Sequence, residues 1–371
     1  MKKKLKISSL PKTKNKTNLN RVHSYDFLRG IAILAVIIVH AHQVFPSGVS
    51  IINSVSEMGR FGVHLFFLVS ALTMCHIWQQ RKEQPNAIRK FYIRRIVRIA
   101  PLFWLAIPTY LYFNASGEIR WIQEDVEPLK ILLTASFLHG FWPNYLNNVV
   151  PGAWSIAAEM IFYGFFPFLM LTIGNNKKLY LYLAFLIWAF NVFYFEIMLD
   201  NYFSEYYLSL LGNPWTPMVQ EFLVLNFINV APVYLIGCYL FFYVNERISF
   251  EEIFLLLTWI FVAAYAKYFF GINDVDYLLI YSSIVFFTII CVKRKINSFY
   301  IELLGKYSYG MYLFHFLAIF LINKLCSFDN YNHSVVYFMV VILVTILSFL
   351  LSLMLYNLIE KPIQKWVSRV T

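Results

Sequence analysis

An arginine and a histidine interrupt the first long apolar stretch of the sequence. Arg29 and His40 lie eleven residues apart in the run 27–45. Eleven residues of α-helix rise about 16 Å and return to within roughly 20° of the starting direction, so both side chains face the same side. A neutral imidazole there could act as a general base. The alternative is a structural hydrogen bond between helices, and composition alone leaves both open.

Three more titratable residues interrupt other apolar runs: Glu159, His64 and His315. Counted along ideal helices, they reach about the same depth as His40 in one half of a bilayer. Ionisable groups inside a membrane are costly and usually functional. We therefore predict one acid/base layer in which Glu159 orients or charge-balances His40. For His64 taken alone, a hydrogen bond between helices is the favoured interpretation.

A cluster of arginines precedes the apolar run 97–113. Arg94, Arg95 and Arg98 lie near the expected level of Arg29. Residues three apart on a helix face nearly the same side, which places Arg95 and Arg98 together. The pattern predicts an arginine layer below the acid/base layer. For Arg94 alone, a topology anchor at the membrane edge is the favoured alternative.

The composition indicates what must position these residues. The chain has 371 residues, of which 60% are hydrophobic and only 14% charged. Soluble domains average roughly 45–50% apolar and about 25% charged residues, so these values exclude most soluble folds, disorder and collagen-like repeats. The four cysteines are scattered and form no ligand cluster with histidines, which predicts neither a disulfide framework nor a metal site. We expect an all-α polytopic membrane protein.

About ten apolar runs are long enough to cross a bilayer, which needs about 20 residues each. They are 27–45, 61–78, 97–113, 154–173, 179–197, 222–244, 253–271, 277–292, 299–325 and 334–358. Lysine and arginine concentrate in alternate loops and at both ends of the chain, so we expect both termini in the cytoplasm. The segment 129–142 is shorter and is predicted to be re-entrant or interfacial.

The net charge of +11 also lies mostly at the membrane surface. Residues 1–25 are predicted to form a basic, disordered cytoplasmic tail that contacts anionic lipids, with no role in nucleic-acid binding. Residues 26–371 are expected to form a single membrane domain. We expect no appended extracytoplasmic hydrolase-like domain after the final span.

The run SYDFLRGIAILAVIIVH (24–40) resembles the opening signature of the acyltransferase-3 family of bacterial membrane O-acyltransferases. The arginine and histidine of that signature would be Arg29 and His40. Five further blocks resemble the family in order: GRFGVHLFFLVSA (59–71), FYIRRIVRIAPLFW (91–104), PGAWSIAAEMIFYGFFP (151–167), LGKYSYGMYLFH (304–315) and IEKP (359–362). Two positions depart from the family pattern, because Ala71 replaces the usual glycine and His64 stands where an acidic residue is more usual. These departures bear on packing and substrate preference.

The resemblance implies transfer of an acyl group, usually acetyl, from cytoplasmic acetyl-CoA to a sugar hydroxyl of a cell-envelope glycan. The acceptor would be a surface polysaccharide or lipopolysaccharide such as O-antigen, and the location a bacterial cytoplasmic (inner) membrane. Arg29, Arg95 and Arg98, with Arg94, would hold the phosphates of the coenzyme. His40 would be the general base or an acyl carrier. A transporter or glycolipid flippase is the alternative, and self-association is left open.

Overall fold

The computed structural model describes residues 22–114, 119, 121–122, 127–146, 149–191, 225–243, 249–270, 274–328 and 331–370. Within these ranges the chain is helical and contains no strand. Side-chain positions are not described for 263–279. The predicted tail lies outside the described residues up to position 21, and its last residues belong to a helix that begins at His23. The expected all-α class is therefore confirmed for the described part of the chain.

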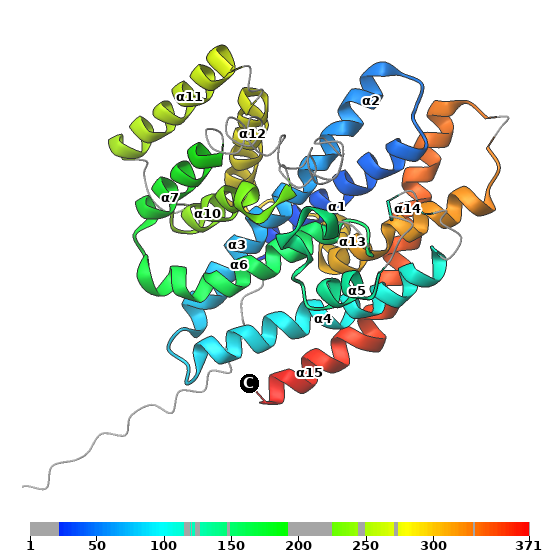
Figure 1. Ribbon diagram of the computed structural model, residues 1–371, viewed down its shortest axis with the longest axis horizontal. Coiled ribbons are helices and arrows are strands. Elements are labelled where there is room, and N and C mark those ends of the chain that lie inside the picture. The colour runs from blue at the N-terminus through cyan, green and yellow to red at the C-terminus, as the bar shows by residue number, and fades with distance from the viewer. Residues whose placement is uncertain are drawn as a thin grey trace, which may run out of the picture.

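Helices α1 (His23–Val44) and α13 (Phe299–Leu325) cross at the centre of the molecule (Figure 1). Two glycines permit their close approach. A Cβ atom on Gly305 would lie 1.8 Å from the carbonyl oxygen of Asp26, and one on Gly30 would lie 2.0 Å from that of Ile301. Neither position tolerates a side chain without a shift of backbone. This contact fixes the position of α1, which carries Arg29 and His40, against α13.

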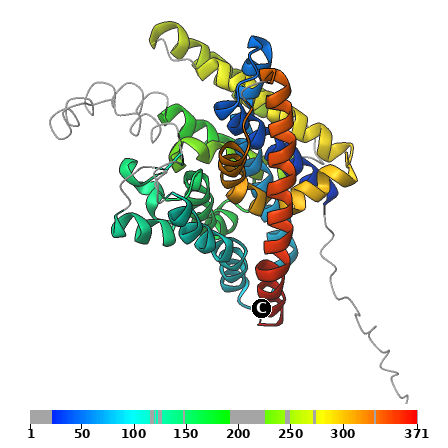
Figure 2. The same ribbon diagram turned by 90° about the vertical axis from the view of Figure 1, so that its right-hand side faces the viewer.

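Three further helices surround this crossing. They are α3 (Gly62–Arg81), α4 (Ala87–Phe113) and α6 (Ala153–Thr172). α14 (His333–Leu355) packs on α13 and continues through a π-helical turn, η5 (Tyr356–Glu360), into α15 (Lys361–Val370). Figure 2 shows α14 and α15 as one nearly continuous rod, coloured orange to red.

The remaining long helices lie on the side of the molecule opposite α14 (Figure 1). They are α7 (Lys177–Phe190), α10 (Phe227–Tyr243), α11 (Phe250–Phe270) and α12 (Asp274–Lys293). α10 packs closely on α3, where a Cβ on Gly237 would lie 2.7 Å from the carbonyl oxygen of Leu68. This arrangement supports α3 from behind, on the side away from α1.

Among the described residues, six helical stretches are long and apolar enough to cross a membrane: His23–Val44, Ser50–Arg81, Ala87–Phe113, Ala153–Thr172, Phe299–Leu325 and His333–Arg369. Phe227–Tyr243 and Ile280–Lys293 are shorter apolar helices. The multi-pass character is therefore supported. The number of ten spans and the cytoplasmic position of both termini stay predictions, and the predicted runs 179–197 and 222–244 extend partly outside the described residues.

Short helices connect the long ones on the side of the C-terminal end of α1. α2 (Ser50–Glu57) and the 3-10 turn η1 (Met58–Phe61) lead directly into α3. α5 (Pro128–Ala135) has eight residues and is followed by the 3-10 turns η2 (His139–Phe141) and η3 (Pro143–Tyr145). Eight helical residues rise only about 12 Å, less than half of the hydrocarbon thickness. This agrees with the prediction that 129–142 does not span the membrane as a helix.

Candidate active site

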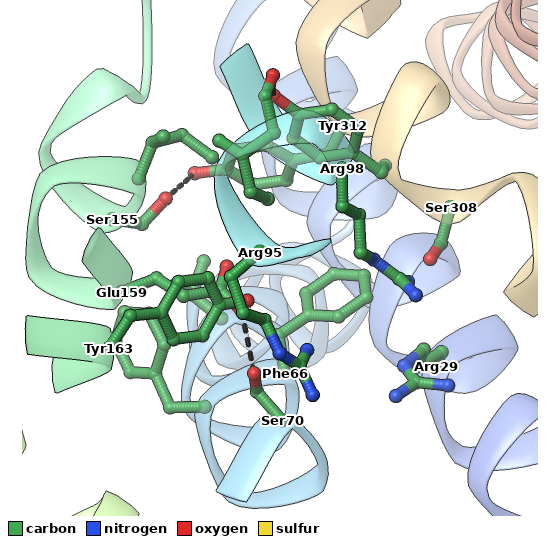
Figure 3. A pocket seen from close by; sticks show the side chains of 15 residues that line it. Arg29, Phe66, Ser70, Arg95, Arg98, Ser155, Glu159, Tyr163, Ser308 and Tyr312 are labelled. Carbon is green, nitrogen blue, oxygen red and sulfur yellow. Dashed lines mark hydrogen bonds between the residues drawn. The ribbon is translucent and has the colours of Figure 1, made fainter. Parts of the chain in front are cut away.

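A cavity of about 70 Å³ lies between α1, α3, α4, α6 and α13. Four of the predicted site residues line it, namely Arg29, Arg95, Arg98 and Glu159. Figure 3 shows the three arginines with their guanidinium groups pointing into the same space. The helix arithmetic therefore correctly places Arg29 at the level of the α4 arginines. The cavity is positively charged on this side.

Arg95 is the most deeply buried of these arginines, with 6% of its surface exposed. Its guanidinium lies over the rings of Tyr163, at 5.2 Å, and Phe91, at 5.6 Å. Its Nη2 atom is buried and has no hydrogen-bond partner among the described residues. A buried guanidinium nitrogen without a partner is costly unless an acceptor reaches it. The site is therefore built to receive an anionic or carbonyl oxygen.

Arg29 is held in place by its neighbours. Its Nη1 donates to Asp26 Oδ1 at 3.0 Å, and its Nη2 donates to the hydroxyl of Thr73. The carboxylate one turn earlier on α1 and the hydroxyl on α3 fix the plane of the guanidinium. An arginine with a fixed plane is well suited to bidentate recognition of phosphate or carboxylate.

Glu159 forms the acidic wall of the cavity on α6. It accepts hydrogen bonds from Ser70 Oγ at 2.6 Å and from the Tyr163 hydroxyl at 2.5 Å. Figure 3 shows the contact with Ser70 beside Arg95. The prediction that Glu159 orients His40 is thus corrected, because its hydrogen bonds in the described structure go to α3 and α6 and its charge faces the arginine cavity.

Tyr312 on α13 also lines the cavity. The Tyr312 hydroxyl contacts Ser155 Oγ at 2.7 Å and donates to the carbonyl oxygen of Gly152 at 3.0 Å (Figure 3). Gly152 has φ of +72°, and a Cβ there would lie 2.9 Å from the Tyr312 hydroxyl, so a glycine is required at this corner. Phe66 packs edge-on against the tyrosine ring at 6.1 Å. Phe66, Ser155 and Tyr312 thus form one wall of the cavity.

Two histidines pack together directly beyond Tyr312. The His315 ring lies 5.8 Å from that of Tyr312 and 5.2 Å from that of His40. His315 is fully buried, and its Nδ1 contacts the carbonyl oxygen of Tyr312 at 2.7 Å. Because a carbonyl only accepts, Nδ1 carries the proton and Nε2 carries the lone pair. That Nε2 atom is buried without a hydrogen-bond partner in the described chain.

The other two predicted residues lie apart. His64 Nε2 contacts the Tyr281 hydroxyl at 3.1 Å, and its ring packs among those of Phe61 and Phe67. Arg94 is half-buried on α4 and does not line the cavity. The single layer predicted for four titratable groups is therefore corrected. Only His315 joins His40, Glu159 joins the arginines, and His64 bridges α3 and α12.

Five of the six sequence blocks, and all the residues that line this cavity, lie within the part of the chain that matches a family model. A family model described as an acyltransferase domain, that of the acyltransferase-3 family, matches residues 22–357. This chain belongs to the acyltransferase-3 family. The match covers every helix that contributes to the cavity and to the histidine pair.

Curated relatives extend the comparison. A protein of Staphylococcus aureus (strain COL), named as a candidate O-acetyltransferase, is 24% identical over 396 residues, covering 95% of this chain and 59% of the relative. The peptidoglycan O-acetyltransferase OatA of Listeria monocytogenes is 27% identical over 177 residues, covering 43% of this chain and 26% of OatA. A candidate acetyltransferase of Acidianus two-tailed virus is 24% identical and covers 78% of this chain and 81% of the relative. The chain thus spans about 59% of the length of the S. aureus relatives. No solved structure matches it.

Sequence reasoning missed several members of this acyltransferase-3 site. The residues are polar side chains at helical spacing from the predicted ones: Ser70, Ser155, Tyr163, Ser308 and Tyr312. Tyr163 lies one turn after Glu159, and Tyr312 lies one turn before the α13 histidine. A search for hydroxyls three or four residues before or after each titratable residue would have found both.

Proposed function

We propose that the chain is a membrane O-acetyltransferase that moves an acetyl group from cytoplasmic acetyl-CoA to a sugar hydroxyl of a cell-envelope glycan. The observation that carries the proposal is the order of groups along one path. Three arginines and Tyr312 line the cavity, and a pair of imidazoles packs beside Tyr312, outside the cavity lining. A phosphorylated thioester on a long arm needs such a path.

The arginines suit the donor. Coenzyme A carries phosphates at one end of a long pantetheine arm, and arginine forks bind phosphate strongly. Arg29 and His40 share one face of α1, about 16 Å apart by helical rise. Phosphate held by Arg29, Arg95 and Arg98 therefore directs the thioester along α1 toward His40. The unpartnered Nη2 of Arg95 supports this assignment.

His40 is assigned as the general base. Its imidazole removes the proton of the acceptor hydroxyl while the oxygen attacks the thioester carbonyl carbon. The carbon–sulfur bond then breaks, and the imidazolium returns its proton to the departing thiolate of coenzyme A. An acyl-histidine intermediate is the competing route, and rapid acid quenching of a single turnover would trap it.

The names of the relatives support the acceptor class. The Listeria relative is named for O-acetylation of peptidoglycan, which is an envelope glycan. We therefore propose an envelope polysaccharide as acceptor and a bacterial cytoplasmic membrane as location. Membrane lipids are the expected surroundings.

The test is turnover of labelled acetyl-CoA by the purified protein in nanodiscs, with a soluble glycan fragment as acceptor. Release of free coenzyme A together with labelled glycan is expected, and the His40→Ala protein serves as control. Passage of glycan or lipid across the bilayer of a proteoliposome without thioester consumption would support a transporter or flippase and refute the proposal.

A further inference from the structure

Gln43 joins His40 to a segment far away in the sequence. The Oε1 atom of Gln43 lies 3.0 Å from Nδ1 of His40, one turn earlier on α1. The same oxygen accepts a hydrogen bond from the indole Nε1 of Trp121 at 3.0 Å. Trp121 lies between α4 and α5, 78 residues further along the chain. One amide oxygen is therefore shared between two ring nitrogens.

The indole decides which way the amide points. An indole N–H is a donor and never an acceptor, so the amide atom that faces Trp121 must be oxygen. The same oxygen faces His40, and an oxygen of this kind can only accept. Nδ1 of His40 must therefore carry a hydrogen, and in the neutral ring Nε2 carries the lone pair. The tautomer of His40 is therefore decided by the indole N–H of Trp121, which can only donate a hydrogen bond.

The ring is also held by packing on several sides. Phe316 lies 4.4 Å from the His40 ring, His315 lies 5.2 Å away, and Trp121 packs edge-on at 6.0 Å. Trp121 in turn packs on Phe316 at 4.8 Å. Rotation of the imidazole about its χ angles would break the Gln43 contact and disturb these rings. The orientation of Nε2 is thus set by hydrogen bonding and packing together.

We propose that Gln43, itself fixed by Trp121, is a positioning residue that holds His40 in the Nδ1–H tautomer and leaves Nε2 free as the base. This inference rests on the proposed function, because it names what prepares His40 for proton removal. A carboxylate at position 43 would also accept the hydrogen from Nδ1, whereas an aliphatic side chain would not.

Gln43→Leu removes the acceptor with little change of volume. Loss of a hydrogen-bond partner that orients a functional histidine lowers activity about 10- to 100-fold in comparable cases, and we expect a fall in kcat of this size. Gln43→Glu should restore most of the activity, because its carboxylate accepts from both ring N–H groups. Trp121→Phe keeps an aromatic ring and removes only the donor, so its loss should be smaller than that of Gln43→Leu.

A matched control lies elsewhere on the molecule. Gln80 on α3 contacts a ring nitrogen of His76 at 2.8 Å, one turn away, and neither residue lines the cavity. Gln80→Leu therefore deletes a second glutamine–histidine contact outside the site. It should leave kcat unchanged while Gln43→Leu lowers it.

The ¹⁵N spectrum of histidine-labelled protein gives a readout that a merely structural role would not move. Wild-type protein should show His40 with a protonated Nδ1 and an unprotonated Nε2, assigned by the signals lost in His40→Ala. Gln43→Leu should shift His40 toward the opposite tautomer, and Gln43→Glu should not.

A wild-type His40 with unprotonated Nδ1 would overturn the inference, and so would a Gln43→Leu protein with normal kcat and tautomer. If Gln43→Leu does not fold, the wild-type spectrum and Trp121→Phe still decide. Failure of the proposed function is distinguishable from this outcome, because the wild-type protein itself would then consume no acetyl-CoA.

Discussion

Replacing Arg95 by lysine separates a phosphate site from a topology anchor. Lysine keeps the positive charge but loses the planar fork and the stacking of the guanidinium between Tyr163 and Phe91. A hydrogen bond to a charged group contributes about 1.5–3 kcal/mol, and lysine retains part of it, so we expect a loss of about 1–3 kcal/mol. At about 1.4 kcal/mol per tenfold, acetyl-CoA should bind roughly 5- to 150-fold more weakly.

The assay is titration of acetyl-CoA against the purified proteins in nanodiscs, by calorimetry or by competition with a fluorescent coenzyme A derivative. Arg94→Lys is the matched control, since the adjacent arginine does not line the cavity. It should bind acetyl-CoA like the wild type. Both variants keep the positive charge that orients α4, so both should insert. Equal affinity of wild type, Arg95→Lys and Arg94→Lys would show that Arg95 is only an anchor and would move the donor site elsewhere.

Three further predictions concern the base, the acidic wall and the topology. His40→Ala should lower acyl transfer by about 10²–10⁴-fold, the scale for loss of a general base, while the protein still inserts; near-normal turnover would refute the assignment. Glu159→Leu leaves the hydroxyls of Ser70 and Tyr163 without an acceptor. Each unsatisfied buried group should lower the free energy of unfolding by about 1–3 kcal/mol, which is measured as a lower melting temperature in detergent. An unchanged melting temperature would show that water replaces the carboxylate. Cysteines placed at Lys177 and Asp274 should react with impermeant reagents from opposite sides, and labelling from one side would contradict the ten-span scheme.

The helix arithmetic was reliable wherever the residues lie on one helix or at one membrane edge. Arg29 and the pair Arg95 and Arg98 line one cavity, as their shared depth predicted. The depth of a residue in the membrane does not say, however, in which direction its side chain points around the helix axis. Glu159 faces the arginines, although its predicted level is that of His40. The direction in which α6 turns its side chains depends on packing against α3 and α4, which periodicity does not encode.

The histidine pair could not be derived from the sequence because it depends on one close helix crossing. Gly30 and Gly305 allow the α1 and α13 backbones to meet, and this register brings His315 to His40. Trp121 is a harder case, since it belongs to a connection without helical periodicity. The ten spans stay a prediction, because the runs 179–197 and 222–244 extend beyond the described parts of α7 and α10.

The position of Tyr312 has a consequence for how the donor meets the base. The arginines line the cavity, and the imidazoles lie beyond the tyrosine, whose hydroxyl contacts Ser155 and Gly152. If the proposed donor binds in this cavity, its acetyl group would pass Tyr312 on the way to His40, and we expect the tyrosine to leave these two partners as it does so. Each such hydrogen bond contributes about 0.5–1.5 kcal/mol net, so opening costs about 1–3 kcal/mol. A state at that free energy is populated at the per cent level, and a donor that fits only the open path shifts the population toward it.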